Sequence, residues 1–489
     1  MQRITIDPIT RLEGHGKIEI FLNEEGNVAN TYFQVPELRG FEVFCLGRPA
    51  EEMPRLTNRI CGVCPEAHHM AATKALDDLF HVEAPPAAHK IREMFYMAFY
   101  CTDHTTHFYA LGGPDFVVGP NAPAAERNVL GVVAAAGLEA GLAVIDCRKR
   151  NHEVIKRLGG RAIHPVTGLP GGWAVALSEE DRAFSEEVAQ KNVDFALFSL
   201  QLFDDIVLKN SAYVDLIVSE GYTQPMYYMG LVDENNHVNF YDGKVRVVDP
   251  NGDEYCKYAP HEYTEHIAEH VEPHSYLKYP YLKNVGWKGF ECGIDSGMYC
   301  ATPLSRLNAA DAMATPKAQE AYEKMYETLG GKPVHHTLAC HWARLVELLY
   351  SAERMLELCQ DPEITDPHVR NIPTETPTEG IGIVEAPRGT LTHHYVTDEN
   401  GVLIGVNLIV GTTNNFAPIT LSIMKAADAV IKNGVVNDGV LNMVEMAFRS
   451  YDPCLSCATH SLPGQMPLEI IVRNADGGLV ERLTQYVDE

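Results

Sequence analysis

Two pairs of cysteines, each with two residues between its members, stand near opposite ends of the sequence. Cys61 and Cys64 belong to RICGVCPEAHH, and Cys454 and Cys457 belong to YDPCLSCATH. Cysteine thiolates at this spacing bind zinc, iron–sulfur clusters or nickel. A zinc ribbon places its two pairs roughly 15–20 residues apart, whereas nearly the whole chain separates these. The cysteines therefore predict a metal centre that joins the two ends of the protein, and their spacing leaves the metal open.

The composition limits what the protein can bind. The chain has 489 residues and a net charge of −27, which argues against nucleic acid and anionic lipid as partners. No apolar run reaches transmembrane length and the first residues do not form a signal peptide, so we expect a cytoplasmic protein without direct membrane insertion. Twelve cysteines are too few for a disulfide scaffold. We expect the eight unpaired ones to be buried as small apolar side chains: Cys45, Cys101, Cys147, Cys256, Cys292, Cys300, Cys340 and Cys359.

The spacing of apolar residues predicts a mainly α-helical protein with peripheral β structure, an α+β fold around a central bundle of long helices. One long helix is predicted over residues 126–160, ending at a glycine pair, and another begins after Ser178. The chain divides into β elements with an N-terminal hairpin (1–60), a helical core (61–224), a β-rich insertion (225–300), a mixed helical and β core (301–460) and a C-terminal extension (461–489). The extension itself has the pattern of a hairpin.

Five further motifs accompany the cysteine pairs. They are TRLEGH from Thr10, RGFE from Arg39, DHTTHFY from Asp103, GRAIHPVTGLPGG from Gly160 and EAPRG from Glu385. Together with the cysteine motifs, and in the same order, they resemble the large, catalytic subunits of NiFe hydrogenases over nearly the whole chain to His460. The resemblance implies the large-subunit fold and the reversible heterolytic cleavage of dihydrogen into protons and electrons.

The resemblance also assigns roles to the cysteines. It implies that all four bind nickel, and that Cys64 and Cys457 bridge to an iron that carries cyanide and carbon monoxide. Such ligands keep the iron low-spin, which side chains cannot do. The Cys454 thiolate is then the first base for the proton, and Glu13 in TRLEGH relays that proton outward. Without its flanking motif, Glu13 would be interpreted as an acid that caps a turn.

The surroundings of the open coordination site follow from the same resemblance. The resemblance implies that Arg388 overhangs that site. An arginine suits this place, because a guanidinium stays protonated and its planar fork can be held by carboxylates. Asp103 and Asp452 match the two carboxylates that hold it. Pro387 and His68 are also expected to border the centre.

One departure from the family lies beside the expected iron ligands. Where much of the family has a Pro-Ser or similar pair facing the cyanides, this chain has Gly411 and Thr412. The Thr412 hydroxyl can still donate to a cyanide nitrogen, whereas Gly411 removes an apolar wall.

A second metal site is implied near the C-terminus. Glu42 in RGFE and His460 match its ligands, and a backbone carbonyl near Leu408 completes the set. Oxygen and imidazole ligands with water suit a hard cation. Magnesium is therefore expected there, with iron as the other candidate.

The sequence contains no route for electrons, since it has neither a further cysteine cluster nor a dinucleotide-binding glycine motif. We therefore expect an iron–sulfur small subunit, docked against the HPVTGLPGG loop (164–172), and further iron–sulfur or flavin subunits. Overall similarity favours the type that does not reduce deazaflavin and that feeds a heterodisulfide reductase or ferredoxin; NAD-linked or electron-bifurcating enzymes are the alternative. Family members carry an extension after the position of His460, so a maturation protease is expected to remove residues 461–489.

Two hypotheses from other classes compete with this interpretation. One is a zinc-bound scaffold in a redox complex, which elemental analysis would distinguish. The other is a non-catalytic scaffold that shares the fold, but such relatives have lost the four cysteines that this chain keeps.

Overall fold

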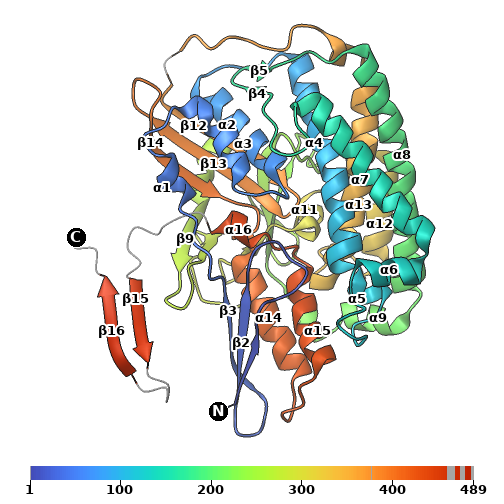
Figure 1. Ribbon diagram of the computed structural model, residues 1–489, viewed down its shortest axis with the longest axis vertical. Helices are drawn as coiled ribbons and strands as arrows, with labels where there is room; N and C mark the ends of the chain where they lie inside the picture. The colour runs from blue at the N-terminus through green and yellow to red at the C-terminus, as the bar shows by residue number, and fades with distance from the viewer. Residues whose placement is uncertain (1, 376, 460–467, 474–478, 486–489) are drawn as a thin grey trace.

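The long helices form the bundle that the sequence predicts. The computed structural model describes residues 2–375, 377–459, 468–473 and 479–485. In Figure 1 the long helices run side by side through one half of the molecule: α4 (Pro86–Thr106), α7 (Leu138–Gly159), α8 (Glu179–Phe203) and α13 (Cys340–Gln360), with α12 (Pro316–Thr328) against α13. Helices α4 and α13 form the inner pair and are buried on nearly every side, as expected of helices that are apolar all round.

The ends of the long helices follow from local sequence. Ser178 caps α8, where its hydroxyl accepts the amide of Asp181 at 3.1 Å, and α7 ends at Gly160 in the left-handed conformation. The helix predicted over 126–160 is interrupted, however. Gly137, with φ at 94°, separates α6 (Val129–Ala136) from α7. The apolar spacing continues across this glycine, so periodicity alone does not reveal the break.

Shorter helices connect the bundle to the sheets. They are α1 (Phe41–Cys45), α2 (Met53–Leu56), α3 (Pro65–Leu79), α5 (Pro114–Val117), α9 (Ser211–Ile217), α10 (Tyr263–His266), α11 (Pro303–Ala309), α14 (Phe416–Val430), α15 (Asp438–Arg449) and α16 (Leu455–Ala458). Helix α16, which includes Cys457, follows α14 and α15 and lies in the middle of the molecule in Figure 1.

The N-terminal strands form an antiparallel sheet in the order β1 (Gln2–Ile6), β2 (Lys17–Leu22) and β3 (Val28–Gln34). The hairpin predicted here is confirmed, with Ile18 opposite Phe33. Alternate residues of β2 are buried in one apolar cluster with side chains of α14, because successive side chains of a strand point to opposite faces.

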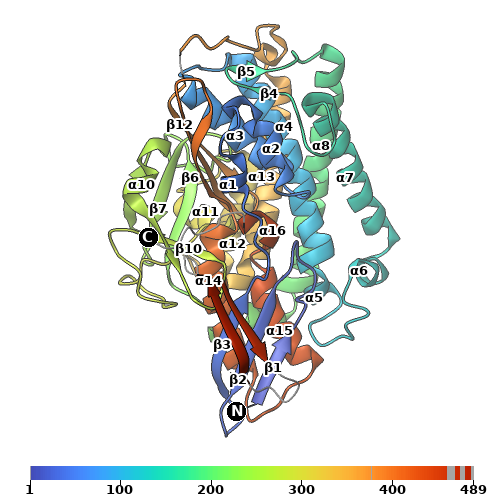
Figure 2. The ribbon, with the colours of Figure 1, turned by 60° about the vertical axis from the view of Figure 1, so that its left-hand side comes forward.

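The middle of the chain supplies a second set of strands. A sheet in the order β11 (Tyr299–Cys300), β6 (Tyr227–Val232), β7 (Lys244–Val248) and β8 (Glu254–Tyr258) lies near the pair β9 (Ile267–Val271) and β10 (Lys278–Leu282). Figure 2 shows β6 and β7 on the side of the bundle opposite α7. These strands lie where the sequence predicts a β-rich insertion, while the division of the chain into five units stays a prediction.

A third sheet packs directly on the helix that follows the first cysteine pair. Strands β12 (Glu379–Ala386), β13 (Gly389–Thr397) and β14 (Leu403–Ile409) are antiparallel, and β12 crosses α3. Gly382 permits this contact, because a Cβ there would lie 2.2 Å from the carbonyl oxygen of Ala71. The crossing places the β12–β13 turn close to the start of α3.

Three further predictions concern local features. The hairpin predicted in the C-terminal extension is confirmed: β15 (Leu468–Arg473) pairs with β16 (Leu479–Gln485) in an antiparallel register. Cys256 and Cys292 are partly exposed, so the prediction that all eight unpaired cysteines are buried is wrong for these two. Both lie in the thin β-rich part of the chain. Among the described residues, no helix is both long and apolar enough to cross a membrane.

Candidate metal centre

The two cysteine pairs meet in one buried cluster. Their sulfur atoms all lie within 4.8 Å of one another, and in the described part of the chain this is the only group of three or more metal-binding side chains so close together. Sγ of Cys61 is 3.3 Å from Sγ of Cys454, and Sγ of Cys64 is 3.5 Å from Sγ of Cys457. The cluster therefore joins the two ends of the chain, as the cysteine spacing predicts.

Short elements from both ends hold the cysteines in place. Cys64 directly precedes α3, and Cys454 directly precedes α16. The N-terminal segment lies against α16, where the amide of Leu455 donates to the carbonyl of Glu13 at 3.0 Å. Gly14 is needed in this segment, because its φ is +87° and a Cβ would lie 2.8 Å from the Ser456 nitrogen.

The protonation of the four thiols shows how the cluster fits a cation. Hydrogen bonds from its neighbours, that from Cys454 first, lower the pKa of Cys61 well below its usual value. Burial raises the pKa of Cys454 and Cys457, and the neighbouring thiols raise it further at Cys454. Burial therefore disfavours the thiolate form of Cys454 and Cys457. A bound cation would stabilise all four as thiolates, because metal binding releases their protons, and a set of four soft sulfur donors suits nickel and iron.

Glu13 lies against the cluster on the side of Cys454. Its Oε2 accepts the thiol proton of Cys454 at 3.0 Å and the amide of Ser456 at 3.1 Å. Burial raises the pKa of Glu13, and the negative charge of Cys61 adds to this effect. The carboxyl group is half-buried, so it connects the sulfur atoms with the edge of the protein.

Arg388 lies on the opposite side, at the tip of the β12–β13 hairpin. Its Nη1 is 3.0 Å from Oδ2 of Asp103, and its Nη2 is 3.0 Å from Oδ2 of Asp452. Burial lowers the pKa of Arg388, but the two carboxylates outweigh it and keep that pKa well above its usual value. Burial raises the pKa of Asp452 to about 7 against the pull of Arg388 and Arg344. The predicted arrangement of one guanidinium between two carboxylates is present.

A small cavity lies between Arg388 and three of the four cysteines. Its lining includes Cys64, Cys454, Cys457, Arg388, His68, Gly411, Thr412 and Ala386. The Thr412 hydroxyl accepts the amide of Cys454 at 3.0 Å and still has its own proton to donate. Close packing explains the glycine at position 411, since a Cβ there would lie 2.9 Å from the carbonyl oxygen of Gly389.

Two of the expected neighbours make specific contacts behind the cavity. His68 Nδ1 lies 3.1 Å from Nε2 of His393. Pro387 contributes its carbonyl oxygen, which accepts from Arg306 at 3.2 Å and from Arg344 at 3.3 Å. Pro387 thus faces the buried arginines, and its neighbours Ala386 and Arg388 face the cavity.

The residues expected at a second metal site are partly together. Oε1 of the buried Glu42 accepts the amide of Leu408 at 2.7 Å, so Leu408 approaches through its N–H group. His460 lies outside the described residues. The ammonium group of Lys278, which the sequence did not point to, is 3.9 Å from Oε2 of Glu42.

The loop between the first two cysteines reaches the surface. Gly62 and Val63 are exposed although Cys61 and Cys64 are buried, and Val63 retains 39% of its accessible surface. Most of the loop over 164–172, by contrast, is buried within this chain. The amide of Gly168 in that loop donates to Nε2 of His69 at 2.9 Å.

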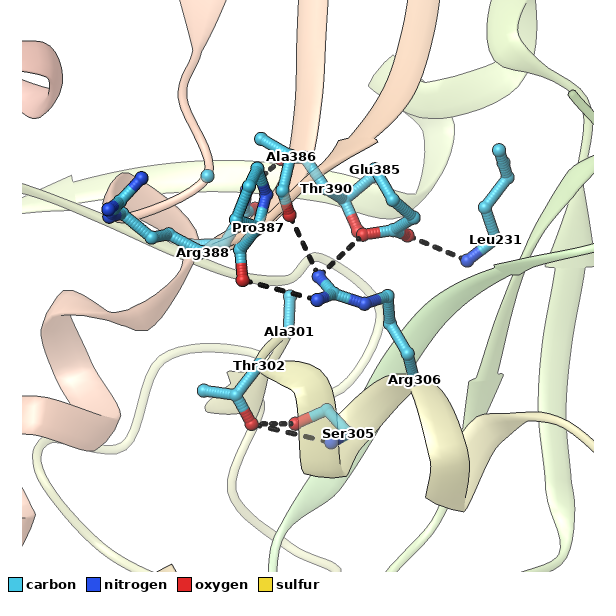
Figure 3. Close-up of polar contacts among 12 residues, drawn as sticks. Leu231, Ala301, Thr302, Ser305, Arg306, Glu385, Ala386, Pro387, Arg388 and Thr390 are labelled. Atoms are coloured by element: carbon cyan, nitrogen blue, oxygen red, sulfur yellow. Dashed lines mark hydrogen bonds and ion pairs between the residues drawn. The ribbon is translucent and has the colours of Figure 1, made fainter. Parts of the chain in front are cut away.

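A second layer of buried charge was missed by the sequence interpretation. Arg306, Arg344 and Glu347 are completely buried behind Arg388, and Figure 3 shows Arg306 among the carbonyl groups that precede Arg388. A charged residue inside an apolar helical stretch, such as CHWARLVELLY around Arg344, is the signal that could have found them, because buried charges require partners.

Comparison with known proteins gives consistent matches over the chain. Residues 39–136 and 224–460 match the nickel-dependent hydrogenase family, and residues 3–38 match a family described as HoxL-like. An iron-sulfur subunit of the F420-non-reducing hydrogenase of Archaeoglobus profundus is 48% identical over 99% of this chain and 100% of its own length. The NAD-reducing hydrogenase HoxS subunit beta of Cupriavidus necator is 38% identical over 98% of this chain and 99% of its own length.

Solved structures agree with these matches. A crystal structure of an NAD+-reducing NiFe hydrogenase in the H2-reduced state has a TM-score of 0.88 and 35% identity, covering 94% of this chain and all of that chain. The Ni-Fe-Se hydrogenase of D. vulgaris Hildenborough has a TM-score of 0.74 at 24% identity over the same 94% of this chain and all of its own, a likeness of fold alone. The predicted α+β fold and the predicted resemblance are both confirmed.

Proposed function

The chain belongs to the nickel-dependent hydrogenase family as a large, catalytic subunit, and we propose that its four clustered cysteines hold the nickel–iron centre at which dihydrogen is cleaved. The observation that carries this proposal is the convergence of four buried sulfur atoms within 4.8 Å, beneath a guanidinium. Cys64 and Cys457 would be the two that also hold the iron, which would carry cyanide and carbon monoxide. When bound, the centre supplies the Lewis acidity that polarises dihydrogen so that a base can remove a proton.

The side chains around the cavity perform the proton chemistry. The thiolate of Cys454 takes the proton, and Glu13 accepts it next, since its Oε2 is 3.0 Å from that sulfur. The raised pKa of Glu13 helps, because its carboxylate has a higher affinity for the proton than an exposed one. Half-buried, Glu13 can then release the proton toward the surface.

Arg388 supplies fixed positive charge on the other side of the cavity. Asp103 and Asp452 hold its guanidinium, so that no reorganisation is needed when charge develops below it. Thr412, Gly411 and Ala386 line the cavity, so the Thr412 hydroxyl would be available to donate to a cyanide nitrogen of the bound centre.

A second cation, magnesium or iron, is proposed beside Glu42 with His460 as its other side-chain ligand. The carboxylate of Glu42 and the family resemblance support this, because carboxylate oxygens are the ligands that a hard cation prefers. Its contact with the amide of Leu408 fixes the carboxylate, and Lys278 provides part of the balancing charge.

Electrons leave through a separate subunit that carries iron–sulfur clusters. We place its docking surface over Gly62 and Val63, since these two exposed residues lie between two of the proposed metal ligands. Most of residues 164–172 are buried within this chain and cannot contact a partner. We therefore propose the exposed Ile163, directly before this loop, as the contact there. Apolar exposed side chains of this kind are typical of the core of a protein interface.

Two of the relatives support a proposal for the electron acceptor. The chain is 48% identical to a relative from an F420-non-reducing enzyme and 38% identical to one from an NAD-reducing enzyme, which favours the first type. We therefore propose that further iron–sulfur or flavin subunits pass electrons to a heterodisulfide reductase or ferredoxin. An NAD-linked enzyme is the second candidate, favoured by the TM-score of 0.88 to an NAD+-reducing hydrogenase.

Substitution of the ligands tests the assignment of the centre. Cys64→Ser and Cys454→Ala each remove one soft donor, and both are expected to abolish hydrogen-dependent reduction of viologen and to lower the nickel content measured by elemental analysis. Cys359→Ser, at a buried cysteine outside the cluster, is the control and should keep both. Full nickel with near-normal turnover in either ligand variant would overturn the four-thiolate assignment.

A further inference from the structure

The turn that carries Arg388 is held through its backbone as well as through its side chain. Strands β12 and β13 are joined by Pro387 and Arg388 alone, since Ala386 pairs with Gly389. Each carbonyl of residues 385–388 accepts a hydrogen bond from a buried side chain outside the hairpin. The donors are Tyr96 and Tyr100 for residue 385, Arg306 for residue 386, Arg306 and Arg344 for residue 387, and Asn415 for residue 388. Water ordinarily satisfies such turn carbonyls, and here protein donors replace it.

Arg306, on α11, makes the central contacts of this arrangement. Its guanidinium donates to the carbonyl of Ala386 at 2.9 Å and to that of Pro387 at 3.2 Å. Figure 3 shows the guanidinium directed at these two carbonyls, with the Arg388 side chain extending away on the other side of the turn. Arg306 therefore sets the position of the turn without contacting the metal cavity.

Arg306 is itself fixed by buried carboxylates. Glu347, on α13, accepts its Nε and Nη2 at 2.6 Å each, and Glu385 accepts its Nη1 at 3.2 Å. Glu347 also lies 2.9 Å from Nε2 of His104. The planar fork of an arginine bonded at both ends has a single orientation, unlike a lysine ammonium.

These contacts close a ring with the ion pair of Arg388. His104 follows Asp103 on α4, and Asp103 is the partner of Arg388. The ring runs through Arg388, Asp103, His104, Glu347, Arg306 and Pro387. The side chain and the backbone of Arg388 are thus both held by contacts that lead to the inner helices α4 and α13.

We propose that Arg306, locked by Glu347, is a positioning residue that fixes where the Arg388 guanidinium stands over the metal cavity. The inference rests on the proposed role of Arg388 at the centre. A misplacement of about 1 Å in an active site costs on the order of a hundredfold in rate. The turn cannot absorb such a shift toward the cavity side, because Gly389 and Gly411 are already in backbone contact, with a built Cβ on Gly389 only 2.5 Å from the Gly411 oxygen.

A double-mutant cycle on the purified complex tests the proposal. Arg306→Lys keeps the charge and loses the fork, so we expect hydrogen-dependent viologen reduction to fall at least about tenfold in kcat with KM for dihydrogen unchanged. The same substitution added to Arg388→Lys should change kcat by less than about twofold, because Arg306 then has nothing to position. Losses that multiply in the double variant, or an unchanged kcat in Arg306→Lys, would overturn the proposal.

The structure of the Arg306→Lys complex gives a readout that does not depend on activity. The distance between Arg388 Nη1 and Asp103 Oδ2, 3.0 Å here, should lengthen beyond hydrogen-bonding range. An unmoved Arg388 would refute the positioning role. Should Arg306→Lys fail to fold, Glu347→Asp replaces it in the same cycle, because the shorter side chain withdraws both oxygens that hold Arg306. Glu347→Asp should then lower kcat only when Arg388 is present.

A matched arginine serves as the control. Arg246 is also held by two carboxylates, Glu254 and Asp311 at 2.7 Å each, and donates to the carbonyl of Ala309 at 2.8 Å. Arg246→Lys should leave kcat within about twofold of wild type, and an equal loss there would assign the effect to buried arginines in general. Wild-type complex without nickel would overturn the proposed function itself, whereas a loaded, active wild type with an inert Arg306→Lys overturns only the positioning role.

Discussion

Replacing Glu13 by glutamine separates proton transfer from metal binding. Oε2 of Glu13 accepts both the thiol of Cys454, at 3.0 Å, and the amide of Ser456, at 3.1 Å. The amide oxygen of a glutamine can still accept from both groups, but a neutral amide cannot take up a proton as a carboxylate does. Replacing a charged acceptor by a neutral one in these hydrogen bonds costs about 1 kcal/mol, so the folded, metal-loaded chain should persist.

The effect on turnover should be far larger than the effect on stability. A positioned acid or base contributes roughly 10²–10⁴-fold to a proton-transfer rate, which corresponds to about 3–5 kcal/mol of activation free energy. We therefore expect Glu13→Gln to lower the exchange of dihydrogen with deuterated water at least about a hundredfold, as followed by mass spectrometry. Nickel content and thermal midpoint should stay close to those of wild type.

Glu37→Gln provides the matched control for Glu13→Gln. Glu37 is a partly buried carboxylate of the same N-terminal segment, and it pairs with His15 and not with a cysteine. Its substitution should leave isotope exchange unchanged. An exchange rate in Glu13→Gln within about twofold of wild type, with nickel in place, would refute the relay through Glu13.

Three other predictions follow from particular contacts. Gly411→Ala places a Cβ 2.9 Å from the Gly389 oxygen, so it should destabilise the protein by about 1–3 kcal/mol in thermal unfolding and lower turnover through a shifted turn; wild-type values in both would contradict the packing role. Burial lowers the pKa of His69 to about 4, so between pH 6.5 and 4 the folded state binds fewer protons than the unfolded state. The free energy of unfolding should therefore decrease by up to about 3 kcal/mol as the pH falls from 6.5 to 4. In denaturant titrations His69→Gln should lose less stability than wild type over this range, and an equal loss in both would refute this. Intact-mass spectrometry of the active complex should find a chain that ends at His460, and full activity with a chain ending at Glu489 would refute removal of the extension.

Each motif carries its own local geometry, which is why the sequence could indicate which residues come together. Cys61 and Cys64 are held by the turn before α3, and Glu13 by the segment that pairs with Cys454, so short stretches of sequence carry the geometry. The same holds for the caps at Ser178 and Gly160, whose backbone conformation depends on the residue itself.

The missed features depend on contacts between distant segments. Arg306 and Glu347 meet only because α11 packs on α13, and neither stretch of sequence indicates that the other is its partner. Lys278 reaches Glu42 from a strand far along the chain for the same reason. Gly137 breaks a helix whose apolar spacing continues unchanged, since a single glycine is tolerated in many helices and interrupts only some.

Infrared spectroscopy of the purified complex tests most directly whether the four cysteines hold a nickel–iron centre. Metal-bound carbon monoxide and cyanide absorb where protein groups do not, and neither zinc nor an iron–sulfur cluster gives such bands. We predict bands of both ligands, together with about one nickel per chain by elemental analysis, and the loss of both in Cys64→Ser. Zinc in place of nickel, with no carbon monoxide or cyanide absorption in an otherwise folded complex, would contradict the account.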